Sequence, residues 1–213
     1  MNAREVLQYV PEDLLDSLAL EYNVDYQVKK LTGRSMFQLL LFSFLTTKET
    51  SYRVIEQVYH SIAFSKANNM VYSGVKYNSI RDRLTNIKAE YFEAIFKFCL
   101  ERFEQDLPSK SNIVSFDSTM VAISSKLLKN GMKLNKKGDK RYLKFTIGFR
   151  NIPIHVSIFN DQQHLSEDLA LSEAILAYSN KEDDIIVFDR GLQSRKIFEN
   201  LPPRWFGFAI RTI

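Results

Sequence analysis

The sequence has few of the residues and stretches that mark disulfide-rich, disordered or membrane proteins. It has one cysteine, Cys99, so an internal disulfide is excluded, as in proteins of a reducing cytoplasm. Five prolines and seven glycines in 213 residues argue against a low-complexity or disordered chain. No apolar stretch reaches the ~18 residues of a membrane span, and no signal peptide is recognisable. We therefore expect a cytoplasmic globular protein without membrane contact, whose 45% apolar residues build a core.

The first half of the chain has the 3.6-residue periodicity of amphipathic helices. The predicted helices are 13–22, 34–45 with Thr32 as its cap, one capped by Thr50 or Ser51, one starting at Tyr77, and a long one through Ile87, Ile95 and Phe103. Pro108 and the polar residues after it end this pattern. The sequence thus predicts an all-helical domain over residues 1–108.

The second half alternates short apolar runs with helical segments. The predicted strands are 113–117 with a hairpin partner at 121–124, then 142–149 and 152–159 joined by a turn at Arg150 and Asn151, then 185–189 and 205–210. Helices are predicted over 165–178 and 193–201. Continuous apolar strands are typical of sheets covered on both faces. Residues 109–213 therefore form, by this interpretation, a mixed sheet with helices packed on it, which makes the whole chain α+β.

Two of the apolar runs end in an aspartate, as Ile-Val-Ser-Phe-Asp117 and Ile-Ile-Val-Phe-Asp189. Functional groups in such sheets gather at the carboxyl ends of strands. Two carboxylates side by side repel each other unless a cation lies between them, and their hard oxygens suit Mg²⁺ or Mn²⁺. Either aspartate alone has the simpler explanation of a turn former or helix cap, and only the matched pair favours a metal site.

The positive charge is concentrated in one segment. Residues 126–144 carry a net +7 whereas the whole chain carries +4, which leaves −3 for the remainder. Its basic residues are Lys126, Lys129, Lys133, Lys136, Lys137, Lys140, Arg141 and Lys144. Such a segment suits contact with DNA phosphates, although a solvated surface hairpin explains the charge equally well. Of the histidines, both of which could bind a metal or phosphate, His155 is expected in the core or on a face of the sheet, and His164 lies in a polar stretch next to a helix start, where a structural role is also expected more often than a ligand role.

The residues around the two aspartates resemble a known family. Phe116-Asp117-Ser118-Thr119 is similar to the first catalytic block of bacterial insertion-sequence transposases of the insertion-sequence-4 type. Asp189-Arg190-Gly191 resembles their second block, and the sequence Phe-Ala-Ile-Arg211 resembles the strand that follows it. The helical half is similar too, so the resemblance covers nearly the whole chain.

The resemblance implies a ribonuclease H-like catalytic domain over 109–213 that cuts and joins DNA with Mg²⁺ or Mn²⁺. Asp117 and Asp189 would be the catalytic metal ligands, and Arg190 would help to hold the phosphate. The helical half would recognise transposon ends or contact a partner. The implied partners are double-stranded DNA, as transposon ends and target, and a second copy in a synaptic dimer, in association with the bacterial nucleoid.

The sequence departs from the family at the third acidic residue. The family has a glutamate on a late helix, whereas Glu199, the one glutamate after Asp189, lacks the family's flanking residues. We therefore expect a C-terminally truncated transposase with little activity alone, lacking its last helix. The alternative is a non-catalytic derivative that binds transposon ends or a full-length partner and inhibits transposition. A third interpretation is an unrelated α+β protein in which both aspartates only form turns.

Overall fold

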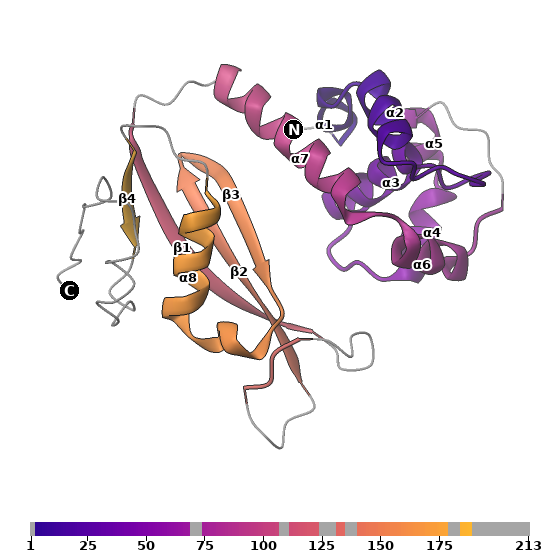
Figure 1. Ribbon diagram of the computed structural model, residues 1–213. Coiled ribbons are helices and arrows are strands. Elements are labelled where there is room, and N and C mark those ends of the chain that lie inside the picture. Colours follow the sequence, from indigo (N-terminus) through magenta and orange to yellow (C-terminus); the bar gives the residue numbers. More distant parts are fainter. Residues whose placement is uncertain are drawn as a thin grey trace. The chain divides into compact units, whose positions relative to one another are not determined.

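The computed structural model describes residues 3–68, 74–106, 111–123, 131–134, 140–178 and 184–188. The chain divides into two compact units, Met1–Gln105 and Asp106–Ile213. The described part contains eight α-helices and one four-stranded mixed sheet (Figure 1). The prediction of an α+β chain is thereby confirmed.

The first unit is built from helices. They are α1 (Ala3–Tyr9), α2 (Glu12–Glu21), α3 (Gly33–Thr46), α4 (Tyr52–Tyr59), α5 (Ile62–Asn68), α6 (Tyr77–Asn86) and α7 (Ala89–Asp106). Thr32 caps α3 by accepting a hydrogen bond from the Ser35 amide at 3.2 Å. Ser51, rather than Thr50, caps α4 by accepting from the Val54 amide at 3.3 Å. The sequence interpretation missed α1 and α5, because each has only seven residues and is too short to establish a period.

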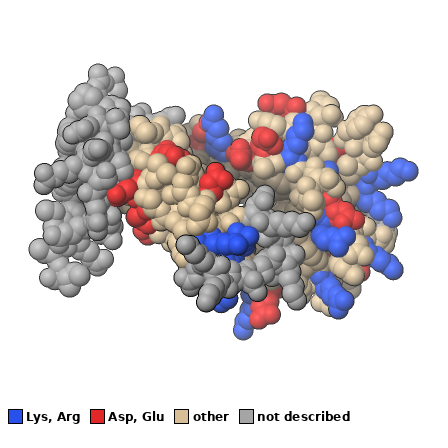
Figure 2. All heavy atoms as spheres, turned by 60° about the horizontal axis from the view of Figure 1, so that its bottom comes forward, with Lys and Arg blue, Asp and Glu red and all other residues tan. Residues whose placement is uncertain are grey.

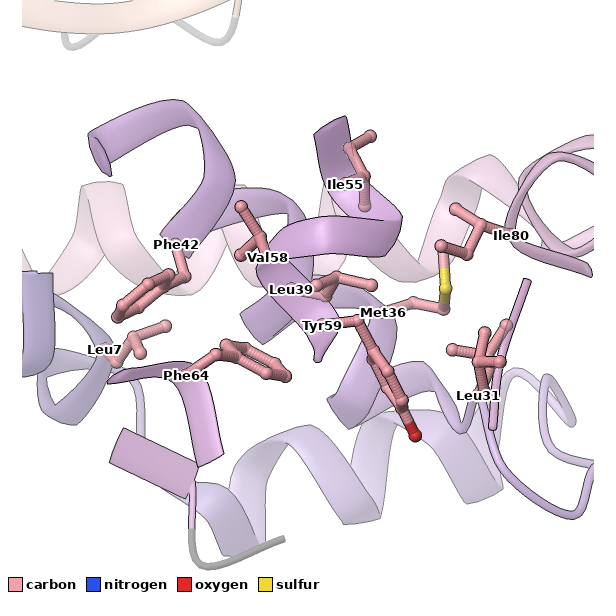
Figure 3. Close-up of a cluster of buried hydrophobic side chains, with 11 residues drawn as sticks. Leu7, Leu31, Met36, Leu39, Phe42, Ile55, Val58, Tyr59, Phe64 and Ile80 are labelled. Carbon is pink, nitrogen blue, oxygen red and sulfur yellow. The ribbon is translucent and has the colours of Figure 1, made fainter. Parts of the chain in front are cut away.

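Two clusters of buried side chains hold these helices together. The first cluster contains Met36 and Leu39 of α3 and Phe64 of α5 (Figure 3). The second joins α2 to α7 through Leu15, Tyr91 and neighbouring apolar residues. The Tyr91 hydroxyl donates to the Leu15 carbonyl at 3.3 Å, and burial raises the pKa of this phenol. The amphipathic stripes read from the sequence therefore face these two cores.

The second unit contains the sheet. Its elements are β1 (Ile113–Ile123), β2 (Arg141–Arg150), β3 (Ile152–Phe159), the short 3₁₀ helix η1 (Gln162–Leu165), α8 (Glu167–Ala177) and β4 (Ile185–Phe188). The strand order is β3-β2-β1-β4. The first three strands form an antiparallel meander, and β4 pairs in parallel with β1. Asn151 makes the predicted turn between β2 and β3 with a left-handed φ of 67°.

The predicted hairpin at 121–124 is wrong. Residues 113–123 form one continuous strand, in which Asp117 pairs with Ile147 of β2 and Ile123 pairs with Arg141. Ser118 and Thr119 continue the ladder instead of turning, because β2 offers a partner along this whole length. Asp117 therefore lies in the middle of a strand and does not terminate it. The helix predicted over 193–201 and the strand over 205–210 lie outside the described residues.

One face of the sheet packs against α8. Leu171, Ala174 and Ile175 of α8 are buried against Val114 and Phe116 of β1, together with Ile186 of β4. Side chains alternate between the two faces of a strand. The odd-numbered residues of β1, including Asp117, therefore lie on the face away from α8. Exposed apolar side chains on that second face are Ile113, Val121, Phe149, Ile158 and Ile185.

Candidate functional site

Asp117 is held in place by the buried residue before it. Phe116 is 2% exposed, and its ring packs edge-on against Tyr178 at a centroid distance of 5.7 Å. On β2 the facing residue is Gly148, where an added Cβ would lie only 2.9 Å from Phe116 Cζ. Glycine is required there because the ring occupies the space of a side chain. With Phe116 fixed on the α8 side, alternation directs Asp117 to the opposite, exposed face.

The carboxylate of Asp117 has one bonding partner among the described residues. The amide of Ser118 donates to its Oδ1 at 2.8 Å. In the described ranges its Oδ2 has no hydrogen bond, so that oxygen is available to a ligand. Carboxylate oxygens are the ligands that divalent magnesium and manganese prefer. This half of the predicted site therefore fits a hard cation.

The other two residues of the predicted metal and phosphate site, Asp189 and Arg190, lie outside the described residues. They follow β4 directly in the sequence. Pairing between β1 and β4 extends from Ile113 with Ile185 to Phe116 with Phe188. Over the described ranges, no group of three or more His, Cys, Asp or Glu side chains is arranged to hold a metal ion.

The predicted basic segment is only partly described. Lys126, Lys129, Lys136 and Lys137 lie outside the described residues. Lys133 and Lys140 are exposed, and half-buried Arg141 donates to the Gly131 carbonyl at 3.2 Å. Basic and acidic side chains of the described residues are interspersed on the face drawn in Figure 2. On that face the described residues give no patch of one sign.

Lys144 has to be removed from the predicted DNA contacts. Its side chain is 1% exposed, and it lies on the α8 face of the sheet. Its ammonium group donates to the Leu165 carbonyl at 3.1 Å and to Glu167 at 3.3 Å. A buried charge needs such partners, which the end of η1 and the first residue of α8 supply. Lys144 therefore joins β2 to η1 and α8, and its buried ammonium group cannot reach a phosphate.

The two histidines of the second unit differ in burial. His155 is half-buried beside Phe116 and Tyr178, its Nε2 lies 2.9 Å from Ser157 Oγ, and burial lowers its pKa. This agrees with the expected place in the core or on a face of the sheet. His164 is buried, stacks on Phe159 and contacts Glu173 through Nε2 at 2.8 Å. In the described structure it holds η1 to α8.

The sequence interpretation missed a buried ionic cluster at the start of β4. Arg150 at the end of β2 forms an ion pair with Asp184, whose side chain is 2% exposed. The Tyr178 hydroxyl donates to the other oxygen of Asp184 at 2.8 Å and accepts from Arg150 at 3.1 Å. The cluster joins the end of β2 and the end of α8 to the residue before β4. The cluster therefore fixes the start of β4 in the sheet. In the sequence, the one signal for it was the acidic residue before the apolar run 185–188.

The first unit has a groove of a different character. It has a volume of about 690 Å³ and lies between α1, α3 and α7, with a lining that includes Phe37, Phe92 and Phe103. Among the described residues of that lining, Glu5 is the one that carries a charge. Catalytic sites bring several polar groups together, which this groove does not do. The candidate site therefore remains at Asp117.

No helix within the described ranges combines the length and apolarity that crossing a membrane requires. Comparison with protein-family models and with curated proteins finds no match to the sequence.

Proposed function

We propose that the second unit is the ribonuclease H-like core of a DDE transposase. In this proposal Asp117 and Asp189 bind Mg²⁺ or Mn²⁺ on the face of the sheet away from α8. The segment 126–141 contacts the backbone of double-stranded DNA. The first unit, in the same proposal, recognises DNA ends or contacts a second copy.

The observation that carries the proposal is the register between β1 and β4. Phe116 is paired with Phe188, and the next residue after each of them is an aspartate. The proposal requires this pairing to continue by one residue, which would bring the Cα atoms of Asp117 and Asp189 to the spacing of paired strands, about 4.8 Å. The proposal requires that Asp189, like Asp117, directs its carboxylate away from α8.

The order of the strands also supports the proposal. The strands β1, β2 and β3 form an antiparallel meander, and α8 then crosses from β3 over the sheet to β4, which pairs in parallel with β1. The chain thus leaves β1 toward β2 on one side and returns to β4 on the other. The switch between these directions is where α/β sheets place their ligands.

The chemistry of the two residues suits phosphodiester substrates. Divalent ions, when bound, activate a water molecule and stabilise the leaving oxygen in phosphodiester cleavage. The two aspartates hold the ions and supply the negative charge that makes the site selective for them. The ladder on both sides of Phe116 holds Asp117 in position, because β2 pairs on one side and β4 on the other. Rigid strands of this kind hold ligands in place better than loops.

Titration with Mn²⁺, followed by calorimetry, tests this site. The whole chain is expected to bind Mn²⁺, and Asp117→Asn and Asp189→Asn each lower the affinity at least about tenfold. Both variants keep the shape of the side chain and remove only its charge. The matched control is Asp161→Asn, because Asp161 precedes η1 without capping it through its side chain. Wild-type affinity in both site variants, or an equal loss in the control, would contradict the proposed metal site.

A further inference from the structure

Gln162 makes a two-point contact with the basic segment. Its Oε1 accepts a hydrogen bond from the Lys133 amide at 2.9 Å, and its Nε2 donates to the Lys133 carbonyl at 2.9 Å. One side-chain amide thus satisfies both backbone groups of one residue, as a neighbouring strand would. The Lys133 side chain is exposed. Gln162 therefore holds the backbone of Lys133 and leaves its charge in solvent.

The residue before Lys133 is held from another direction. The Met132 amide donates to the Tyr142 carbonyl at 2.9 Å, and the Tyr142 amide donates to the Met132 carbonyl at 3.0 Å. The Met132 side chain is fully buried. Two consecutive residues of the basic segment are thus fixed, one by β2 and the other by η1.

Gln162 can act as an anchor because η1 itself is fixed. His164, two residues on, is buried and bonded to Glu173 of α8 at 2.8 Å. The next residue, Leu165, accepts through its carbonyl from the buried Lys144 ammonium at 3.1 Å. The hydrogen bonds of His164 and Lys144 lie within the second unit, and neither residue is a DNA contact in the proposed function. The internal lysine and histidine thus give the exposed glutamine a rigid base.

We propose that Gln162 is a positioning residue for DNA binding, an inference that rests on the proposed function. It fixes the backbone of Lys133, whose exposed ammonium group is then available to a phosphate. A residue whose backbone is already fixed loses less entropy when a ligand orders its side chain. Gln162 contributes to affinity without itself touching a phosphate.

The test compares Gln162→Met with Gln163→Ala in the whole chain. Methionine keeps the length of the side chain and loses both hydrogen bonds to Lys133. Gln163 is the control, because it lies in the same η1, is exposed, and has no side-chain hydrogen bond within the part of the chain that the structure describes. The readouts are affinity for duplex DNA, the dependence of that affinity on salt, and hydrogen exchange at residues 131–134.

Gln162→Met is expected to weaken DNA binding on the order of tenfold, the effect of losing two modest hydrogen bonds. The slope of log affinity against log salt stays unchanged, because no charge is removed. Exchange at 131–134 becomes faster while exchange in β1 and β2 does not. Unchanged exchange at 131–134, or affinity equal to that of Gln163→Ala, would overturn the inference alone. Absence of DNA binding by the wild-type chain would overturn the proposed function and this inference with it.

Discussion

Asp184→Ala is expected to destabilise the second unit by about 3–5 kcal/mol, the cost of breaking a buried ion pair. Hydrogen exchange in β1 and β2 should become at least a hundredfold faster, because each 1.4 kcal/mol is about a factor of ten. Exchange in α3 and α7 should not change, since these helices belong to the other compact unit. Exchange detected by mass spectrometry on the whole chain resolves the two units separately.

The size of this effect follows from the surroundings of the carboxylate. Asp184 is 2% exposed and Arg150 is 6% exposed, so neither charge is hydrated by bulk water. Asp184→Ala removes the carboxylate that pairs with the Arg150 guanidinium and accepts a hydrogen bond from the Tyr178 hydroxyl. Removing one partner of a buried ion pair costs far more than the pair contributed in the first place.

A double variant separates this explanation from simple loss of packing. Arg150→Met with Asp184→Leu removes both charges and keeps apolar volume, so it should recover most of the lost stability. Asp161→Ala is the exposed control and should change exchange little. A double variant as unstable as Asp184→Ala would mean that the charges do not cause the effect.

Binding to duplex DNA is expected to fall about a thousandfold between about 50 and 200 mM salt, because each neutralised phosphate contributes about −0.9 to the logarithmic slope. In the proposed function, the seven basic residues of segment 126–141 supply these contacts. Lys136→Gln with Lys137→Gln should reduce the steepness of the slope by about two. Fluorescence anisotropy of a labelled duplex at a series of salt concentrations measures both quantities.

The control for this charge change is Lys88→Gln with Lys97→Gln. These lysines are exposed, and they lie outside the basic segment, Lys97 within α7 and Lys88 just before it. The pair removes the same net charge as the double variant of the segment. Because both lysines lie outside segment 126–141, the salt dependence of DNA binding should stay within error of the wild type. Binding that does not respond to salt, or an equal change in the control, would remove segment 126–141 from the proposed interface.

The longer helices and most strands were predictable because local patterns specify them. Thr32 precedes an apolar run and caps α3, and the run 152–159 reads as β3 without knowledge of its partners. The strand β1 was divided in error because Ser118 and Thr119 resemble a polar turn. Only the long ladder with β2, a contact distant in sequence, keeps them extended.

The candidate site was predictable in part for the same reason. The matched apolar runs before Asp117 and Asp189 are visible in the sequence, and the register places the two preceding phenylalanines side by side. The role of Lys144 was not predictable, because charge alone does not distinguish a phosphate contact from a buried ammonium group that binds Leu165 and Glu167. The contact of Gln162 with Lys133 was not predictable, because no sequence pattern distinguishes this glutamine from the polar residues around it.

Iron-directed cleavage of the chain tests most directly whether Asp117 and Asp189 share a metal site. Fe²⁺ bound in place of Mg²⁺ generates hydroxyl radicals with ascorbate and peroxide, and these radicals cut the backbone nearby. The proposed site predicts cuts next to both residue 117 and residue 189, suppressed together by excess Mg²⁺ and by Asp117→Asn. Cuts at only one of these positions, or cuts at both that persist in Asp117→Asn, would contradict a shared site.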